Sequence, residues 1–227
     1  MTDKKTPLSC NLDLYKLLTE KSAAKLEVYE KLKAVFLDFK SVLSEIHTEL
    51  SVDVCGVNEA IEISFEDVSA FETKFQAAGD VLYCYMHSNV FALDEQHYVL
   101  QHSHLKKNPN DAFFGTLNMY YFMADSVRYN RLNDNGILLA RILVNRNGNF
   151  FVEGVKPFGE MERFDESRKL THEVLKGITE KVLRYMLEID LTLPPKAHAQ
   201  LMSVADIQNV RQEMRFKTKQ TLGFMKR

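Results

Sequence analysis

Cysteine is scarce in this sequence, and the positions of the few cysteines exclude a disulfide framework. The chain of 227 residues has three, Cys10, Cys55 and Cys84, and no two of them have the C-x-x-C spacing of a zinc or redox motif. An odd number cannot close into a complete disulfide set, so these cysteines fit a reducing compartment. Cys84 lies in an apolar alternation, and we expect it to be a small buried side chain.

Long hydrophobic runs and an excess of one charge are also missing. The most apolar stretches, such as residues 136–144, are far shorter than the roughly 20 residues that span a bilayer, and the first residues lack the apolar core of a signal peptide. Lys and Arg total 29 against 31 Asp and Glu, which gives no overall attraction to nucleic acid or an acidic membrane. The sequence therefore predicts a cytoplasmic protein that binds no membrane and is not a general nucleic-acid binder.

The usual motifs of nucleotide and zinc chemistry are absent as well. The sequence contains no dinucleotide fingerprint, P-loop, nucleophile elbow or EF-hand loop. His172-Glu173 begins like the zinc protease pair, but Lys176 stands where the second histidine should fall. We therefore expect His172 to lie on a solvated helix face.

A long amphipathic helix is the clearest positive signal. Residues 22–50 contain no Pro or Gly, and their apolar residues recur at alternate spacings of three and four. These residues are Tyr29, Leu32, Phe36, Phe39, Leu43, Ile46 and Leu50, and the stripe is widened by Val28, Val35 and Val42. A stripe of this width predicts a helix packed in a bundle or across a sheet, with Phe36, Phe39 and Leu43 in the core. Lys33 and Lys40 lie off the stripe and should tolerate alanine.

The middle of the chain alternates with a period of two, as half-buried strands do. Residues 61–66 fit one strand, and the spacing of Val68, Phe71 and Phe75 fits a short helix that ends at Gly79. Residues 81–105 alternate on both sides of residues 93–96, which predicts a β-hairpin with its loop centred between Asp94 and Glu95. Residues 113–129 fit strand or helix equally well.

A second hairpin is predicted by Asn147-Gly148, the sequence of a type I′ turn, between apolar runs over residues 137–146 and 149–156. In the register of a two-residue loop, Val144 faces Phe151 and Leu143 faces Val152. Both faces of this hairpin are apolar, so helices or another subunit should cover both of them.

Together these elements predict an α+β fold, in which a long N-terminal helix and C-terminal helices pack on a central antiparallel sheet of about five or six hairpin strands. Asp165 or Ser167 can cap the first C-terminal helix, and Ser203 can cap the last. No linker divides the chain, so we expect residues 1–227 to form a single domain. Its parts are a loose tail at 1–10, a helical region at 12–50, mainly antiparallel sheet at 59–156, a helical region at 164–216 and a basic tail at 217–227.

Charge is unevenly distributed along the chain. Residues 45–80 hold nine acidic residues and one basic residue, Lys74, whereas residues 211–227 hold six basic residues and one acidic residue, Glu213. We expect the basic segment, which includes Arg211, Arg215, Lys217 and Lys219, to be a solvated tail or to bind an acidic protein surface rather than phosphates. Together with the doubly apolar second hairpin, this complementarity predicts a homo-oligomer.

The predicted first hairpin supplies the candidate site. One of its faces would carry Tyr83, Tyr85, His87, Tyr98, His102 and His104, with His87 directly across from His102. Such a face can consist of half-exposed cross-strand pairs, or line a small-molecule site, or bind a divalent metal such as zinc through His87, His102 and His104.

We therefore expect a non-catalytic binding or interaction module without a cofactor, self-associating, that uses this aromatic and histidine face. A metal-dependent enzyme using the three histidines and a carboxylate such as Glu95 is the alternative. A nucleic-acid-binding adaptor working through the basic C-terminal segment is the third hypothesis.

Overall fold

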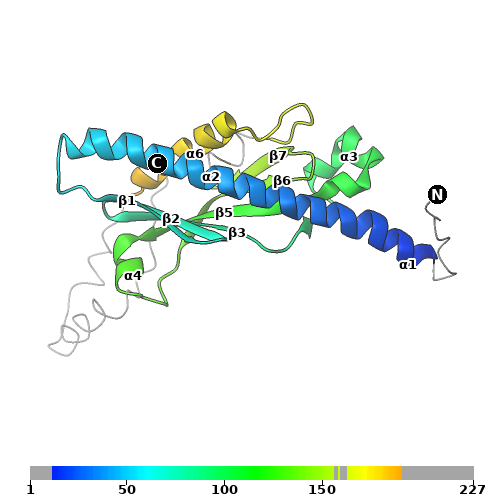
Figure 1. Ribbon diagram of the computed structural model, residues 1–227, viewed down its shortest axis with the longest axis horizontal. Coiled ribbons are helices and arrows are strands. Elements are labelled where there is room, and N and C mark those ends of the chain that lie inside the picture. Colours follow the sequence, from blue (N-terminus) through cyan, green and yellow to red (C-terminus); the bar gives the residue numbers. More distant parts are fainter. Residues whose placement is uncertain (1–11, 156–157, 159–162, 191–227) are drawn as a thin grey trace, which may run out of the picture.

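The computed structural model describes residues 12–155, 158 and 163–190, and all statements on structure concern these residues. They form an antiparallel sheet covered on one face by two helices, so the predicted α+β fold is confirmed (Figure 1). The seven described strands, one more than expected, are β1 (Ile63–Ser69), β2 (Glu72–Ala77), β3 (Asp80–Met86), β4 (Phe91–Ala92), β5 (Phe113–Met123), β6 (Ile137–Val144) and β7 (Phe150–Gly154). Their order is β1-β2-β3-β5-β6-β7, and β4 pairs with β5.

The N-terminal helix is longer than its predicted range. It runs through α1 (Leu12–Lys16), a π-helical segment η1 (Leu17–Ser22) and α2 (Ala23–Cys55), and helical backbone angles at both junctions make it continuous. Gly and Pro have the lowest helix propensities, and neither occurs from Leu12 to Cys55, directly before Gly56. Within the described residues, no helix is both long and apolar enough to cross a bilayer.

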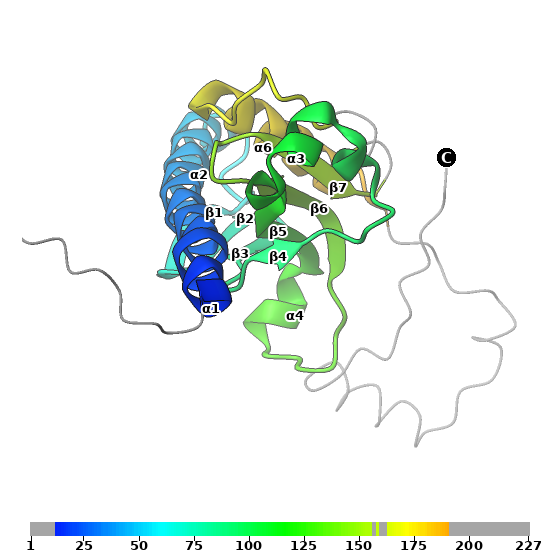
Figure 2. The ribbon, with the colours of Figure 1, turned by 90° about the vertical axis from the view of Figure 1, so that its right-hand side faces the viewer.

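The core lies between this helix, α6 (His172–Leu187) and one face of the sheet. The predicted stripe is confirmed, because Leu32, Phe36, Phe39 and Leu43 are all at most 1% exposed. The widening valines are also buried. From α6, Leu175, Ile178, Val182 and Met186 join the same cluster. Figure 2 shows α2 and α6 side by side on the same side of the sheet.

Lys40 lies off the apolar stripe, but its side chain is buried, so the prediction that it is an exposed residue is wrong. Its side chain passes over the Phe36 ring, 5.0 Å from the centroid, and its Nζ donates to Asp67 and to the Ser69 carbonyl oxygen. A long aliphatic stem lets a charge at the margin of a stripe reach polar partners while the stem is buried. Lys33, by contrast, is exposed as predicted and pairs only locally with Glu30.

An ionic clamp joins the two helices. The imidazole of His172, in the first turn of α6, lies between two carboxylates of α2, 2.6 Å from Asp38 Oδ1 and 3.1 Å from Glu45 Oε2. One turn later, Lys176 donates to Glu49 at 2.8 Å. His172 is therefore a helix-face residue as expected, but it is paired. The first residue of this helix is set by Thr171, whose side chain accepts from the Val174 amide, and not by the predicted caps Asp165 or Ser167.

This clamp should make stability depend on pH. Hydrogen bonds to Asp38 and Glu45 raise the pKa of His172 above its ordinary value, and burial opposes this only in part. A raised folded-state pKa gives stabilisation that is complete below about pH 6.5 and is lost as pH rises through the folded pKa. We expect the melting temperature of the wild type to fall more between pH 6 and pH 8.5 than that of His172→Gln, measured by circular dichroism. Equal pH profiles for the two proteins would show that the clamp contributes nothing.

The strand β2 replaces a predicted helix. Val68, Phe71 and Phe75 fit a helical spacing, but Val68 lies within the edge strand β1, Phe71 lies in the turn, and Phe75 pairs with Phe65 across the β1–β2 hairpin. Gly79 accordingly lies in the next turn and caps no helix. The open question over residues 113–129 is resolved as β5 followed by the short helix α4 (Ala124–Arg128).

The second hairpin is confirmed, but its register is shifted by one residue. Val144 pairs with Phe150 and Leu143 with Phe151, because the loop has three residues instead of two. The Gly148 amide donates to the Asn145 carbonyl, and Gly148 has a φ of 77°. A type I turn followed by one residue with left-handed backbone angles is the usual form of a three-residue hairpin loop. Both faces of the hairpin are covered by this chain itself, by the helices on one side and by a second apolar cluster on the other.

Candidate binding face

The sheet face turned away from α2 and α6 carries a cluster of aromatic and polar side chains, which we call the open face. Leu82, Cys84 and Met86 of β3 point toward the helices, so Tyr83 and Tyr85 point to the other side. Cys84 is fully buried as predicted. The open face is formed by Glu72, Lys74, Tyr83, Tyr85, Asn118, Tyr120, Phe122, Arg141 and Glu153.

One row of directly paired residues crosses five strands of this face. Tyr85 of β3 pairs with Glu72 on one side and with Asn118 on the other. The row continues from Asn118 to Arg141 of β6 and ends at Glu153 of β7. Side chains directly opposite each other in an antiparallel pair have Cβ atoms about 4.5 to 5.5 Å apart, so the five form one continuous surface.

Tyrosines dominate the centre of the open face. The rings of Tyr85 and Tyr120 stack with centroids 5.9 Å apart, and Tyr83 meets Phe122 edge to face at 6.3 Å. All four rings are half-buried. Burial raises the pKa of Tyr83 and Tyr85 above the ordinary value, and contacts with Glu72 and Tyr120 respectively add to the effect. Both hydroxyls therefore stay protonated at neutral pH and can donate hydrogen bonds.

An ion-paired group closes one end of the row. Arg141 binds Glu153 through Nε at 3.1 Å and through a second nitrogen, and His97 Nε2 reaches the other carboxylate oxygen at 3.0 Å. Burial disfavours the charged form of Glu153, but the bonds from Arg141 and His97 outweigh it and hold its pKa below the ordinary value. His97 Nδ1 accepts from the Val99 amide, so the proton of the neutral ring is on Nε2. This group is a fixed, paired charge and not a free base.

The two ends of the open face are covered, which leaves the tyrosines between them. At one end, η2 (Tyr98–Gln101) and α3 (Ser103–Lys107) place Val99 and Leu105 against Phe151 and Phe164. Near the other end, α4 contacts β3 and β5. Figure 1 shows α3 and α4 near opposite ends of the molecule's long axis. The centre of the face is thus held on strands that are fixed on both sides.

The predicted first hairpin over residues 81–105 is wrong. Its first half is β3, but β3 pairs with β2 and β5, and residues 98–101 and 103–107 are helical. Tyr83 and Tyr85 do share one face, as predicted. Tyr98 lies on η2, where its ring meets Phe151 at 6.2 Å, away from that pair.

The three histidines of the zinc hypothesis have separate local partners and do not converge. His87 follows β3, and its ring accepts from the Asn89 amide and packs edge-on against Phe91. His102 precedes α3 and meets Phe164. His104 binds Asp111 at 2.8 Å. The metal hypothesis required His87 to lie directly across from His102, and the two residues are not on paired strands. In the described part of the chain, no group of three or more His, Cys, Asp or Glu could hold a metal ion.

Several acidic residues of the segment 45–80 form ion pairs within the chain, so they are not free to bind the basic segment 211–227 as predicted. Glu45 and Glu49 pair with α6, Asp67 with Lys40, Glu66 with Lys74, and Glu62 with Arg128. The predicted interaction residues Arg211, Arg215, Lys217 and Lys219, the cap Ser203 and the tail at 1–10 lie outside the described residues.

Besides Glu72, Lys74 and Phe122, the sequence analysis missed five residues of the open face and its edge, and each of these five had a signal. If residues 113–123 are a strand, alternation alone places Asn118 and Tyr120 on one face. Arg141 and Glu153 are single charges inside the apolar strands β6 and β7, and an isolated charge in such a run needs a partner. His97 had the weakest signal, because its partner Glu153 is 56 residues away.

Comparison of the chain with protein-family models, with curated proteins and with solved structures found no match. The class that the structure itself defines is an α+β protein with an antiparallel sheet covered by helices on one face and, at the centre of the other face, half-buried aromatic and polar side chains that none of the described helices covers.

Proposed function

We propose that this protein is a non-catalytic binding module whose open face binds a partner protein. The observation that carries the proposal is the cluster of Tyr83, Tyr85 and Tyr120, which lies half-buried at the centre of the open face, on three paired strands of the sheet. Tyrosine gives a large contact area at low cost in conformational entropy, and it is enriched among the residues that dominate protein interfaces.

The chemistry of the face supports binding over catalysis. The hydroxyls of Tyr83 and Tyr85 are protonated donors, and Arg141 is neutralised by Glu153. Asn118 lies buried between them and donates to Thr116 within the chain. A hydrogen-bonding, aromatic surface with a paired charge at its rim has the composition of an interface, with its centre depleted of unpaired charge.

The proposal can be tested by site-specific photo-cross-linking in the cells that make the protein. Benzoylphenylalanine in place of Tyr85 should give a discrete cross-linked product, whose mass identifies the partner. The same amino acid in place of Tyr129, which is 52% exposed and off the face, should not. We expect Tyr120→Ala, combined with the probe at position 85, to reduce the product about tenfold, the effect of losing a contact worth about 1.4 kcal/mol. Equal products at positions 85 and 129 would contradict the proposal.

A further inference from the structure

The N-terminal end of the long helix carries leucines that stay exposed among the residues the structure describes. Leu12, Leu14, Leu17 and Leu18 are each at least 50% exposed, and Tyr15 is 52% exposed. Figure 1 shows this end of the helix, with α1 at its tip, extending past the sheet. Exposed leucine is ordinary when isolated, but a cluster of five large apolar side chains within seven residues marks an interaction surface.

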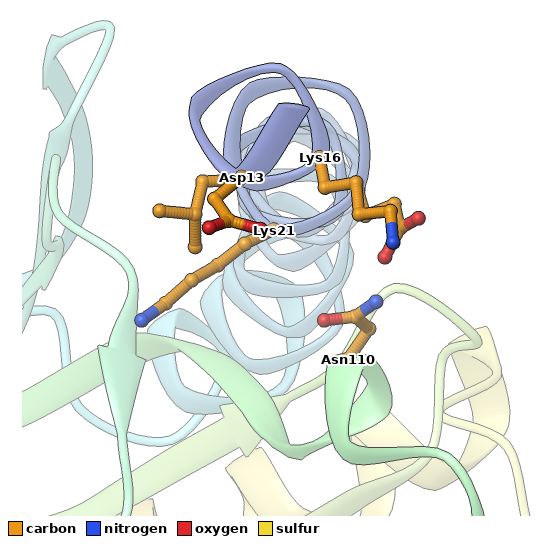
Figure 3. A pocket seen from close by; sticks show the side chains of 6 residues that line it. Asp13, Lys16, Lys21 and Asn110 are labelled. Atoms are coloured by element: carbon orange, nitrogen blue, oxygen red, sulfur yellow. The ribbon is translucent and has the colours of Figure 1, made fainter. Parts of the chain in front are cut away.

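The side of the helix that packs on the sheet is no longer covered by the sheet in residues 12–22. Ala24 and Val28 pack against Phe113 and are almost fully buried. One turn earlier the sheet has ended, and the helix instead borders a hollow of about 420 Å³ lined by Asp13, Lys16, Leu17, Glu20, Lys21 and Asn110. Figure 3 shows Asn110 below the helix, across this hollow from Asp13, Lys16 and Lys21. The segment also contains the π-helical turn, a feature often found at functional sites.

We propose that a second copy of this chain binds here, with the two N-terminal helices antiparallel and crossing at Leu17. The charges favour this occupant. Asp13 and Lys21 each lie four residues from Leu17, so a two-fold axis at Leu17 places Asp13 of one copy beside Lys21 of the other, twice. A parallel pair would instead place Asp13 beside Asp13 and Lys21 beside Lys21 of the other copy, so that like charges meet.

The available area fits a weak dimer. Among the five exposed apolar residues, only Leu14 and Leu18 lie within about 100° of Leu17 around the helix, so these three leucines of two copies offer on the order of 600 Å² in all, the size of a weak, transient contact. Association should therefore be in the micromolar range. This proposal does not depend on the open face, because the two surfaces share no residue.

Sedimentation equilibrium of the full chain tests the proposal. We expect the wild type to form a dimer at about 100 µM, and Leu14→Glu combined with Leu17→Glu to raise the dissociation constant at least about thirtyfold. Glutamate and leucine have similar helix propensities, so circular dichroism should show an unchanged helix content. The matched control is Leu37→Glu, at a position 67% exposed on the same helix, which should leave the dimer intact.

Disulfide cross-linking tests the crossing point. In a Cys10→Ser, Cys55→Ser chain, Leu17→Cys should form a covalent dimer under mild oxidation, because a residue on a two-fold axis meets its own copy. Asp13→Cys and Lys21→Cys should cross-link when the two variants are mixed and far less when each is alone. A monomer at all concentrations, equal loss of dimer in Leu37→Glu, or efficient cross-linking of Asp13→Cys with itself would each overturn the proposal.

Discussion

Replacing Phe39 with alanine is expected to lower the free energy of unfolding by about 3 to 5 kcal/mol. The Phe39 side chain has no exposed surface, and its ring stacks on Phe36 with centroids 6.2 Å apart. It belongs to the one cluster that joins the long helix, the sheet and α6. Removing the ring loses its burial and leaves a cavity that three separate elements cannot easily collapse to fill.

Urea denaturation followed by circular dichroism measures this effect. The control on the same helix is Lys33→Ala, which removes an exposed ion pair with Glu30 and a contact of the ammonium with the Tyr29 ring and should change stability by no more than about 0.5 kcal/mol. If the two variants unfold at the same urea concentration, the core does not lie where the structure places it.

The position of Phe39 could be predicted because helix periodicity is a local property. Twenty-nine residues without Pro or Gly, with one apolar stripe, specify both the helix and its buried side. The parity of a strand is equally local, and this is why Tyr83 and Tyr85 were placed correctly on one face. Lys40 was misplaced because burial of a lysine stem depends on Asp67 and the Ser69 carbonyl, which belong to the sheet.

Strand pairing could not be predicted, because it depends on residues far apart in the sequence. The segment containing His102 and His104 alternates as a strand does, but over so few residues a period of two cannot be distinguished from a short helix. In the fold, β3 has two neighbours, β2 and β5, so its edges are already occupied. The three histidines are consequently separated, and the site moves to a row whose members come from five strands.

The loop of the second hairpin shows how one residue changes a site. A two-residue loop would pair Arg141 with Gly154, whereas the observed three-residue loop pairs it with Glu153. The sequence Asn147-Gly148 suits both loop lengths, because the last loop residue has a left-handed φ in each and glycine adopts that conformation readily. The ion pair at the edge of the open face therefore depends on a turn whose type the sequence left open.

Gly154→Ala should be the second most damaging of the substitutions considered, because the backbone of β6 occupies the space that a methyl group needs. A Cβ at this position would lie 2.2 Å from the Leu139 carbonyl oxygen and 3.0 Å from Ala140 Cα. The contact is this close because β6 is irregular where it pairs with β5, and Val155 donates to that same carbonyl. Backbone cannot rotate away as a side chain can, so β7 or β6 must shift.

We expect Gly154→Ala to cost about 1 to 3 kcal/mol, the range for overpacking a core. The matched control is Gly177→Ala in the middle of α6, where an added Cβ meets no atom within 4 Å. Alanine there should stabilise the protein by about 0.5 to 1 kcal/mol, because it restricts the unfolded chain and favours the helix. The same chemical change therefore has opposite signs at two glycines, and their urea midpoints should move in opposite directions from the wild type. A midpoint for Gly154→Ala at or above that of the wild type would show that β6 and β7 do not approach each other as closely as the structure has them.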